Sequence, residues 1–256
     1  MVDNGRVRGY HEASYGDGFA DVYDEWYEGV TDVGSTTEGL VALAAGGSVL
    51  ELGIGTGRLA LPLAAAGLQV HGIDTSTAML ERLEAKCAAT QPRPDVTGVL
   101  GDMVDALPNG PFSLVFVAYN TFFSLLTEER QRGCFAAVAR VLAPGGAFVV
   151  EAFVPDPFQE PDRSVTVRSV QADRVVLSVS TSDPGDQRAE GQYVDITETG
   201  GVRLRPWSIR WATPIQLDTM AEAAGFRLES RFEDFVGTQF GPDSARHVSV
   251  YRLPAV

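Results

Sequence analysis

The chain has 256 residues, 45% of them hydrophobic, and carries a formal net charge of −14 at pH 7. This length supports one enlarged domain or a core domain with an insertion. The acidic balance disfavours a nucleic-acid partner, because such a surface repels phosphate backbones and no basic run compensates. No run of about 18 apolar residues indicates a membrane span. The first residues lack the apolar core of a secretion signal, so we expect a cytoplasmic protein with no membrane partner.

The N-terminal region, residues 1–45, is expected to form a helical lid. Helices are predicted over residues 18–29 and 35–45. The first carries a stripe of apolar and aromatic residues at helical spacing: Phe19, Val22, Tyr23, Trp26 and Tyr27. Because Tyr23 and Tyr27 are four residues apart, they share one face of the helix. That face either covers a bound ligand or packs into the core.

A glycine-rich turn follows the first predicted strand. The strand carries Glu51 near its end, and Gly53, Gly55 and Gly57 follow at alternate positions before Arg58. Glycines at this spacing let a ligand approach the backbone without meeting a Cβ, and a helix over residues 59–66 then points free N–H groups at the turn. The pattern predicts a nucleotide-type cofactor site. A dinucleotide fingerprint needs glycine where Arg58 stands, so a nicotinamide-dependent oxidoreductase is the disfavoured alternative.

The next three predicted strands also end at polar or small residues. The second strand ends at Asp74, which precedes Thr75, and a carboxylate there can accept hydrogen bonds from both ribose hydroxyls. The third strand precedes Asp102 and Met103. The fourth ends near Ala118 and is followed by Asn120. Strands and helices alternate from residue 48 to 153, which predicts a parallel α/β sheet with right-handed crossovers.

This ordered series resembles the class I S-adenosylmethionine (SAM)-dependent methyltransferases. The residues that carry the resemblance are the Glu51-x-Gly53-x-Gly55-x-Gly57 loop, Asp74, and the Asp102-Met103 pair. The resemblance implies a Rossmann-like seven-stranded sheet with an antiparallel seventh strand, and SAM as the cofactor. It implies that Asp102 meets the adenine amino group while Met103 packs on the ring. The other residues expected at the cofactor are Tyr23, Tyr27, Arg58, Thr75, Ala118 and Asn120.

An antiparallel β insertion is predicted over residues 156–212. Its alternating β-rich runs are separated by the turn sequences Asp183-Pro-Gly-Asp and Thr199-Gly-Gly. The methyltransferase core would then comprise residues 46–155 and 213–256, ending in a helix and two strands.

The insertion and the Tyr23-Asp24-Glu25-Trp26-Tyr27 segment together resemble small-molecule methyltransferases of bacterial secondary metabolism. The nearest group is the aminosugar N,N-dimethyltransferases. This resemblance implies methyl transfer to an oxygen or nitrogen atom of a small organic metabolite. Phe122, Phe123 and Ser124 depart from that group, which offers a ring-bearing polar residue toward the acceptor after strand four. The acceptor therefore stays open, as does the formation of a homodimer.

Candidate catalytic residues lie where the strands meet the ligand edge. Methyl transfer needs a base if the acceptor is an alcohol, a phenol or an ammonium. Glu151 falls near the end of the fifth strand and His247 at the start of the antiparallel seventh, so both are expected at this edge. His247 is otherwise a satisfied histidine in an edge position. The acceptor pocket is expected to draw apolar surface from Phe122, Phe123, Phe153 and Phe240.

Metal binding is not expected, because the sequence has no cluster of Cys and His residues. Cys87 and Cys134 fall in separate predicted helices, and both are expected to be reduced packing residues. A SAM-binding scaffold or sensor without catalysis is the alternative from a different functional class.

Overall fold

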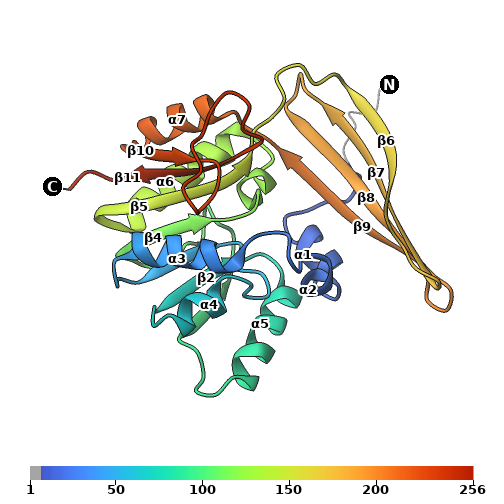
Figure 1. The fold of residues 1–256 in the computed structure, drawn as a ribbon, viewed down its shortest axis with the longest axis horizontal. Helices are drawn as coiled ribbons and strands as arrows, with labels where there is room; N and C mark the ends of the chain where they lie inside the picture. The colour runs from blue at the N-terminus through green and yellow to red at the C-terminus, as the bar shows by residue number, and fades with distance from the viewer. Residues whose placement is uncertain (1–6, 256) are drawn as a thin grey trace.

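The computed structural model describes residues 7–255 and contains two β-sheets. The larger sheet has seven strands in the order β10-β11-β5-β4-β1-β2-β3, and a separate four-stranded sheet projects from one side of it (Figure 1). The strands of the larger sheet are β1 Val49–Leu52, β2 Val70–Asp74, β3 Val96–Leu100, β4 Phe112–Val117, β5 Leu142–Phe153, β10 Arg227–Phe232 and β11 Arg246–Arg252.

The topology of the larger sheet confirms the predicted fold class. Strands β1 to β5 pair in parallel, whereas β11 lies antiparallel to both β5 and β10. Strand β11 therefore begins at the sheet edge where β1, β2, β4 and β5 end. Ligands bind at this carboxyl edge in doubly wound sheets.

Helices cover both faces of the larger sheet. Helices α3 (Val33–Ala44), α4 (Ala60–Ala65) and α5 (Thr77–Ala89) pack on one face, and α6 (Glu128–Val141) and α7 (Pro214–Ala223) pack on the other. Polar side chains fix several helix starts: Thr127 accepts the Arg130 N–H at α6, and Thr213 forms a reciprocal capping box with Gln216 at α7. Helix α6 ends at Val141, and β5 begins at the next residue, Leu142.

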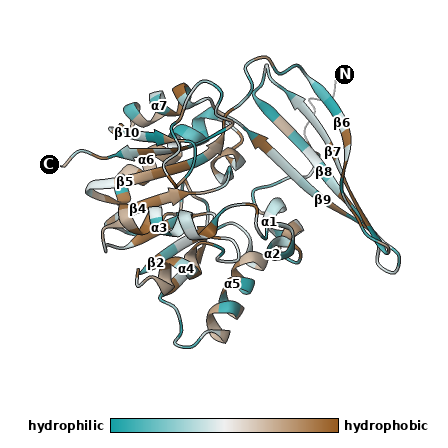
Figure 2. Ribbon diagram, in the orientation of Figure 1, coloured by the Kyte–Doolittle hydropathy of each residue, from teal (hydrophilic) through white to brown (hydrophobic). Residues whose placement is uncertain are grey.

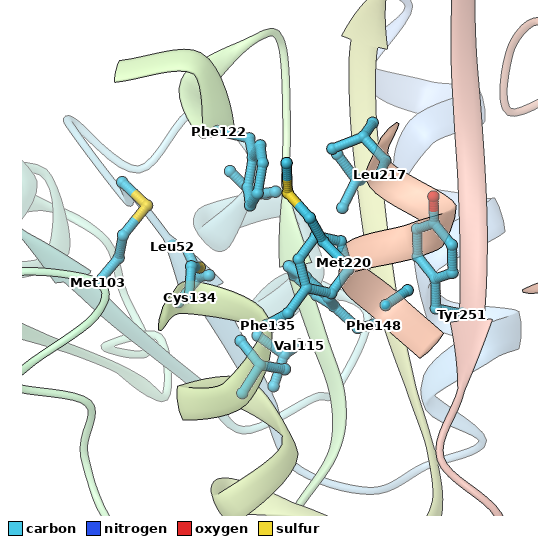
Figure 3. Close-up of a cluster of buried hydrophobic side chains, with 14 of the residues drawn as sticks. Leu52, Met103, Val115, Phe122, Cys134, Phe135, Phe148, Leu217, Met220 and Tyr251 are labelled. Carbon is cyan, nitrogen blue, oxygen red and sulfur yellow. The ribbon is translucent and has the colours of Figure 1, made fainter. Parts of the chain in front are cut away.

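The core is apolar on both sides of the sheet. Strands β4 and β5 are hydrophobic over most of their length (Figure 2). On the α6–α7 face, Phe135 contacts Phe122, Phe148 and Tyr251 edge to face, with ring centroids 5.2 to 5.5 Å apart (Figure 3). Each fully buried side chain of this size contributes about 1.5–3 kcal/mol through the area it removes from water. Cys87 and Cys134 are free and buried, one on each face.

The predicted antiparallel insertion is present as a meander in the order β6-β7-β8-β9. Its strands are β6 Asp162–Val170, β7 Arg174–Asp183, β8 Arg188–Thr197 and β9 Gly201–Arg210. Both predicted turns join neighbouring strands, because Asp183-Pro-Gly-Asp lies between β7 and β8 and Thr199-Gly-Gly between β8 and β9.

The N-terminal helices differ from the prediction. Instead of one helix over residues 18–29, there are two short ones, α1 (Ser14–Phe19) and α2 (Tyr23–Trp26). The chain breaks between them at Asp21, whose carboxylate pairs with Arg203 and Arg205 on β9. The first six residues of the expected 1–45 lid lie outside the described part of the chain.

Candidate active site

The loop after β1 is folded for close approach by a ligand. Gly53, Gly55 and Gly57 have φ of 75°, 54° and 85°, a left-handed region that favours glycine. A Cβ on Gly53 would meet Thr121 Cγ2 at 2.5 Å, and one on Gly57 would meet Leu83 Cδ1 at 2.5 Å. At Gly55 nothing lies nearer to such a Cβ than the Gly53 carbonyl oxygen, at 4.0 Å. The flanking glycines therefore fix the turn, and the space above Gly55 is open.

Glu51 places a buried carboxylate next to this loop. Glu51 is 5% exposed, and its Oε2 atom has no hydrogen-bond partner among the described residues. Burial raises the pKa of Glu51 to about 8, against the opposing effect of Arg58. Because an unpartnered buried carboxylate oxygen is costly, the position suits a ligand that brings a donor or a positive charge.

Asp74 at the end of β2 fixes the two loops around it. Its Oδ2 accepts the Gly55 N–H at 2.9 Å, and its Oδ1 accepts the Ser76 N–H at 2.9 Å. Burial raises its pKa. Thr75 donates its hydroxyl to the Glu12 carbonyl at 3.0 Å, which ties the N-terminal segment to the same edge. Each carboxylate oxygen of Asp74 retains a second lone pair for a ligand hydroxyl.

Asp102 and Met103 follow β3 at the same edge. Asp102 accepts the Val104 N–H at 2.7 Å and forms a close ion pair with Arg130 of α6. Met103 packs against the α6–α7 core and is 9% exposed. Arg130 was not among the predicted site residues. Arg130 lies in the first turn of α6, and nothing in the sequence indicates that its side chain pairs with Asp102, 28 positions earlier.

The N-terminal tyrosines form a cluster that reaches Tyr119, in the turn after β4. Tyr23 and Tyr27 stack with ring centroids 4.6 Å apart, and Tyr15 donates its hydroxyl to the Tyr27 oxygen at 2.6 Å. Asp24 accepts the Thr56 hydroxyl at 2.6 Å. Helix α2 is thus anchored directly to the loop that carries Gly55 and Gly57.

The turn after β4 has a strained backbone. Tyr119 and Asn120 have φ of 47° and 67°, which costs about 1–3 kcal/mol for each non-glycine residue. Glu151 on β5 holds the turn in this conformation. Its carboxylate accepts the Tyr119 N–H at 3.0 Å, and its carbonyl accepts the Asn120 N–H at 3.1 Å. Asn120 Oδ1 then accepts the Phe153 N–H at 2.7 Å. Ala118, just before the turn, is buried. Such strain clusters at functional sites.

Arg58 connects these groups. Its guanidinium lies 5.8 Å from the Tyr119 ring centroid, and it hydrogen-bonds Thr31. Burial raises the pKa of Glu151, and the Tyr119 N–H and Arg58 oppose that rise. Arg58 also opposes the raised pKa of Glu51. The expected residues Glu51, Arg58 and Glu151 therefore share one electrostatic environment. Tyr119, which sequence reasoning left out, belongs to it and stands between two residues expected at the cofactor.

His247 differs from this group in burial and in the direction of its pKa shift. It is fully buried on β11, its Nδ1 lies 2.8 Å from the Ser249 hydroxyl, and Nε2 has no partner among the described residues. Burial, with Arg231 nearby, lowers the pKa of His247 to about 3. An imidazole with this pKa is a weak proton acceptor near neutrality, so the structure gives no support to the base role expected from the sequence.

Two of the four expected pocket phenylalanines are in the core instead. Phe122 and Phe123 are fully buried in the short 3-10 helix η1 (Thr121–Ser124), where Phe122 contacts Phe135 of α6 and Phe123 contacts Phe153. The prediction is wrong for these two residues because η1 turns both rings inward. Phe153 and Phe240 are half-buried.

Metal and membrane features are absent from the described residues. Within residues 7–255 no three His, Cys, Asp or Glu side chains are grouped to hold a metal ion. Over the same range no helix has the length and apolar character needed to cross a membrane.

Comparison with known proteins identifies this arrangement. Residues 49–146 match the model of a family described as a methyltransferase domain. The cypemycin N-terminal methyltransferase of a Streptomyces species is 31% identical over 234 residues, covering 86% of this chain and 92% of that protein. The structure of the CcbJ methyltransferase from Streptomyces caelestis has 39% identity and a TM-score of 0.89, covering 96% of this chain and all (100%) of that chain.

The fold is also shared more widely. A SAM-bound amino pentose methyltransferase from Micromonospora echinaspora has 23% identity and a TM-score of 0.67, covering 91% of this chain and 96% of that one. The chain belongs to the SAM-dependent methyltransferases, with homologues in bacterial secondary metabolism. It is an enzyme whose cofactor is SAM, which sets aside the nicotinamide and non-catalytic alternatives. The open face of Gly55 and the orphaned Glu51 oxygen fit this cofactor, which carries both an ammonium and a sulfonium charge.

Proposed function

We propose that the enzyme transfers a methyl group to a nitrogen atom of a small organic metabolite. The observation that carries this proposal is the half-buried Glu151 carboxylate, held against the strained turn at Tyr119 and Asn120. A carboxylate at this edge suits an amine acceptor, because it can accept a hydrogen bond from the acceptor N–H and then a proton from the methylated ammonium. Two relatives are named for substrates that offer an amino group, the cypemycin N-terminal methyltransferase and the amino pentose methyltransferase.

The protein's contribution to such a reaction is mainly placement. SAM supplies a methyl group already activated on sulfur, and transfer is an in-line displacement in which the nitrogen lone pair forms the new bond as the carbon–sulfur bond breaks. A neutral amine needs orientation more than activation. Glu151 would orient the N–H, while the Tyr27 and Tyr119 rings, 6.0 Å apart, would flank the transfer position. Aromatic faces also favour the positive charge that passes from sulfur to nitrogen.

We propose the following roles for the cofactor-binding residues. The Glu51 carboxylate would meet the ammonium of the cofactor, and Asp74 would accept its ribose hydroxyls. Asp102 would meet the adenine amino group with Met103 against the ring. The other positions that would contact the cofactor are Tyr23, Tyr27, Gly53, Gly55, Gly57, Arg58, Thr75, Ala118 and Asn120. In this division residues 1–45 form the lid, 46–155 and 213–256 the core, and 156–212 the insertion.

The test of the nitrogen proposal compares matched acceptors and matched variants. Small amines and their alcohol analogues are incubated with SAM, and products are identified by mass spectrometry. We expect amines alone to be methylated. Glu151→Gln should lower kcat/KM for amines by about a hundred-fold and remove the part of the low-pH fall that Glu151 causes, leaving the part caused by protonation of the amine itself. Wild-type activity should fall as pH drops through the raised pKa of Glu151, because only the carboxylate accepts a proton. The exposed Glu198→Gln serves as the control. Methylation of alcohols only would contradict the proposal.

We also propose that the chain pairs as a homodimer through the outer face of the β6–β9 sheet. Three neighbouring rows of residues across the four strands are apolar except Gln192 and include the exposed side chains Val165, Val167, Val202 and Leu204. From strand and residue spacings this patch covers on the order of 400 Å², within the ~300–600 Å² range that is often functional. The edge strand β6 adds unpaired backbone groups.

A second copy satisfies both features at once, because two β6 edges can pair antiparallel while the apolar faces meet. Light scattering should give twice the 27.4 kDa mass of one chain at high concentration. Val202→Lys with Leu204→Lys should shift the mass to that of one chain. A wild-type mass of one chain at all concentrations would contradict the dimer.

A further inference from the structure

The four-stranded sheet holds helix α2 through a chain of alternating charges whose middle is buried. Arg174 on β7 donates hydrogen bonds to both carboxylate oxygens of Asp195 on β8, at 2.8 and 2.7 Å. Asp195 also accepts a hydrogen bond from Arg205 on β9 at 3.0 Å. Arg205 in turn donates two hydrogen bonds to the Asp21 carboxylate, at 2.6 and 3.1 Å. Arg205 and Asp195 are 2% and 4% exposed. This chain of contacts links three strands to the turn between α1 and α2.

Trp26 is the second point of attachment. Three guanidinium groups surround its indole: Arg168, Arg205 and Arg174 lie 4.9, 5.3 and 5.4 Å from the ring centroid. Arg168 also donates to the Trp26 carbonyl at 3.0 Å, the last carbonyl of α2, where a positive charge suits the helix dipole. Tyr193 of β8 packs edge-on against the indole at 5.6 Å. We call Arg168, Arg174 and Arg205 the arginine latch.

The opposite side of α2 faces the glycine loop. Asp24 binds Thr56 and Lys86, and Tyr23 and Tyr27 stack on each other. Helix α2 has four residues and no side-chain cap at its N-terminus, and a single turn is unstable by itself in water. Its position is therefore imposed by its neighbours: the glycine loop, the arginine latch, and α1, which contacts Trp26 through Phe19 and Tyr27 through Tyr15. Arg168 of the latch also lies 5.7 Å from the Tyr27 ring centroid.

We propose that the arginine latch positions α2 over the cofactor, so that the β6–β9 sheet governs how tightly cofactor and product are held. Asp21, Asp195 and Trp26 act with the latch as positioning residues. None of them needs to touch the cofactor, because each acts by holding the helix that carries Tyr23 and Tyr27. This inference rests on the proposed placement of those two tyrosines beside the cofactor.

The sharpest variant is Asp21→Asn. It removes the charge on the α1–α2 side of the latch, while Arg205 keeps its pairing with Asp195 inside the sheet. We expect amide exchange over residues 20–27 to rise at least ten-fold in the ligand-free variant, with the core strands unchanged. S-adenosylhomocysteine should dissociate roughly ten-fold faster in stopped-flow measurements. Asp186→Asn, in the exposed turn between β7 and β8, is the control.

A second variant distinguishes loss of the latch from a local folding defect caused by Asp21→Asn. Trp26→Phe keeps an aromatic ring but reduces the cation–π contact, and it should give the same two effects with smaller size. Unchanged exchange in α2, or faster exchange with unchanged S-adenosylhomocysteine dissociation, would overturn the latch. Absence of ligand protection at residues 23–27 in wild-type protein would instead overturn the placement of the tyrosines.

Discussion

Glu51 offers a direct test of the cofactor site, because its protonation state should change when SAM binds. Burial raises its pKa from the ordinary 4.5 to about 8. At 1.36 kcal/mol per tenfold change, ionising this group in the ligand-free protein costs roughly 5 kcal/mol. At pH 7 Glu51 is therefore about nine-tenths protonated. A cofactor that carries an ammonium and a sulfonium charge favours the carboxylate, so binding should expel the proton.

Calorimetry in two buffers of different ionisation enthalpy measures this proton. We expect SAM binding to release up to about 0.9 proton from Glu51 at pH 7 and about 0.1 at pH 9, where the group is already ionised. Glu51→Gln keeps the size and neutral form of the side chain but removes the titration, so the difference between the two proteins isolates Glu51. Equal proton release in wild type and Glu51→Gln at pH 7 would refute the reasoning.

The same variant has a predictable stability profile. A raised folded-state pKa means that the contribution of protonated Glu51 is fully present below about pH 4.5 and is lost as pH rises through about 8. Ligand-free Glu51→Gln should therefore match wild type near pH 4.5 and exceed it by a few kcal/mol at pH 9. Urea unfolding at the two pH values checks this.

Three further predictions concern the lid, the ribose contact and the core. Residues 10–30 should gain protection from hydrogen exchange when S-adenosylhomocysteine binds, and Tyr23→Phe should weaken SAM binding without unfolding the protein; no added protection would exclude a lid. Asp74→Asn should lower SAM affinity roughly ten- to hundred-fold in calorimetry, through loss of a charge-assisted contact; unchanged affinity would remove Asp74 from the site. Phe135→Ala should cost about 3–5 kcal/mol in urea unfolding, whereas Phe158→Ala, at an 88% exposed position, should stay within about 0.5 kcal/mol.

The parts of the fold that sequence reasoning predicted are those with local signals. The alternate glycines from Gly53 to Gly57 permit a sharp turn, and all three adopt the left-handed backbone that glycine favours. The end of β2 at Asp74 and the acid Asp102, two residues after β3, were visible as apolar runs followed by an acid. The meander followed from β-rich runs separated by turn residues such as Asp183-Pro-Gly-Asp.

The parts that could not be predicted depend on contacts distant in sequence. The break between α1 and α2 follows from Asp21 pairing with Arg205, 184 positions away. The burial of His247 depends on how β11 packs beside β5, and burial moves its pKa out of the useful range. The periodicity of the sequence predicts neither the Asp21–Arg205 ion pair nor the burial of His247. The inward turn of Phe122 likewise depends on the position of α6.

The most direct test of the central claim uses SAM labelled with ¹³C at its methyl group. The enzyme is incubated with a panel of small amines and matched alcohols, and the products are followed by proton–carbon correlation spectra. The account predicts labelled N-methyl signals that require active enzyme and fall about a hundred-fold in rate in Glu151→Gln but not in Glu198→Gln. Labelled O-methyl signals alone, or N-methyl signals at an undiminished rate in Glu151→Gln, would contradict it.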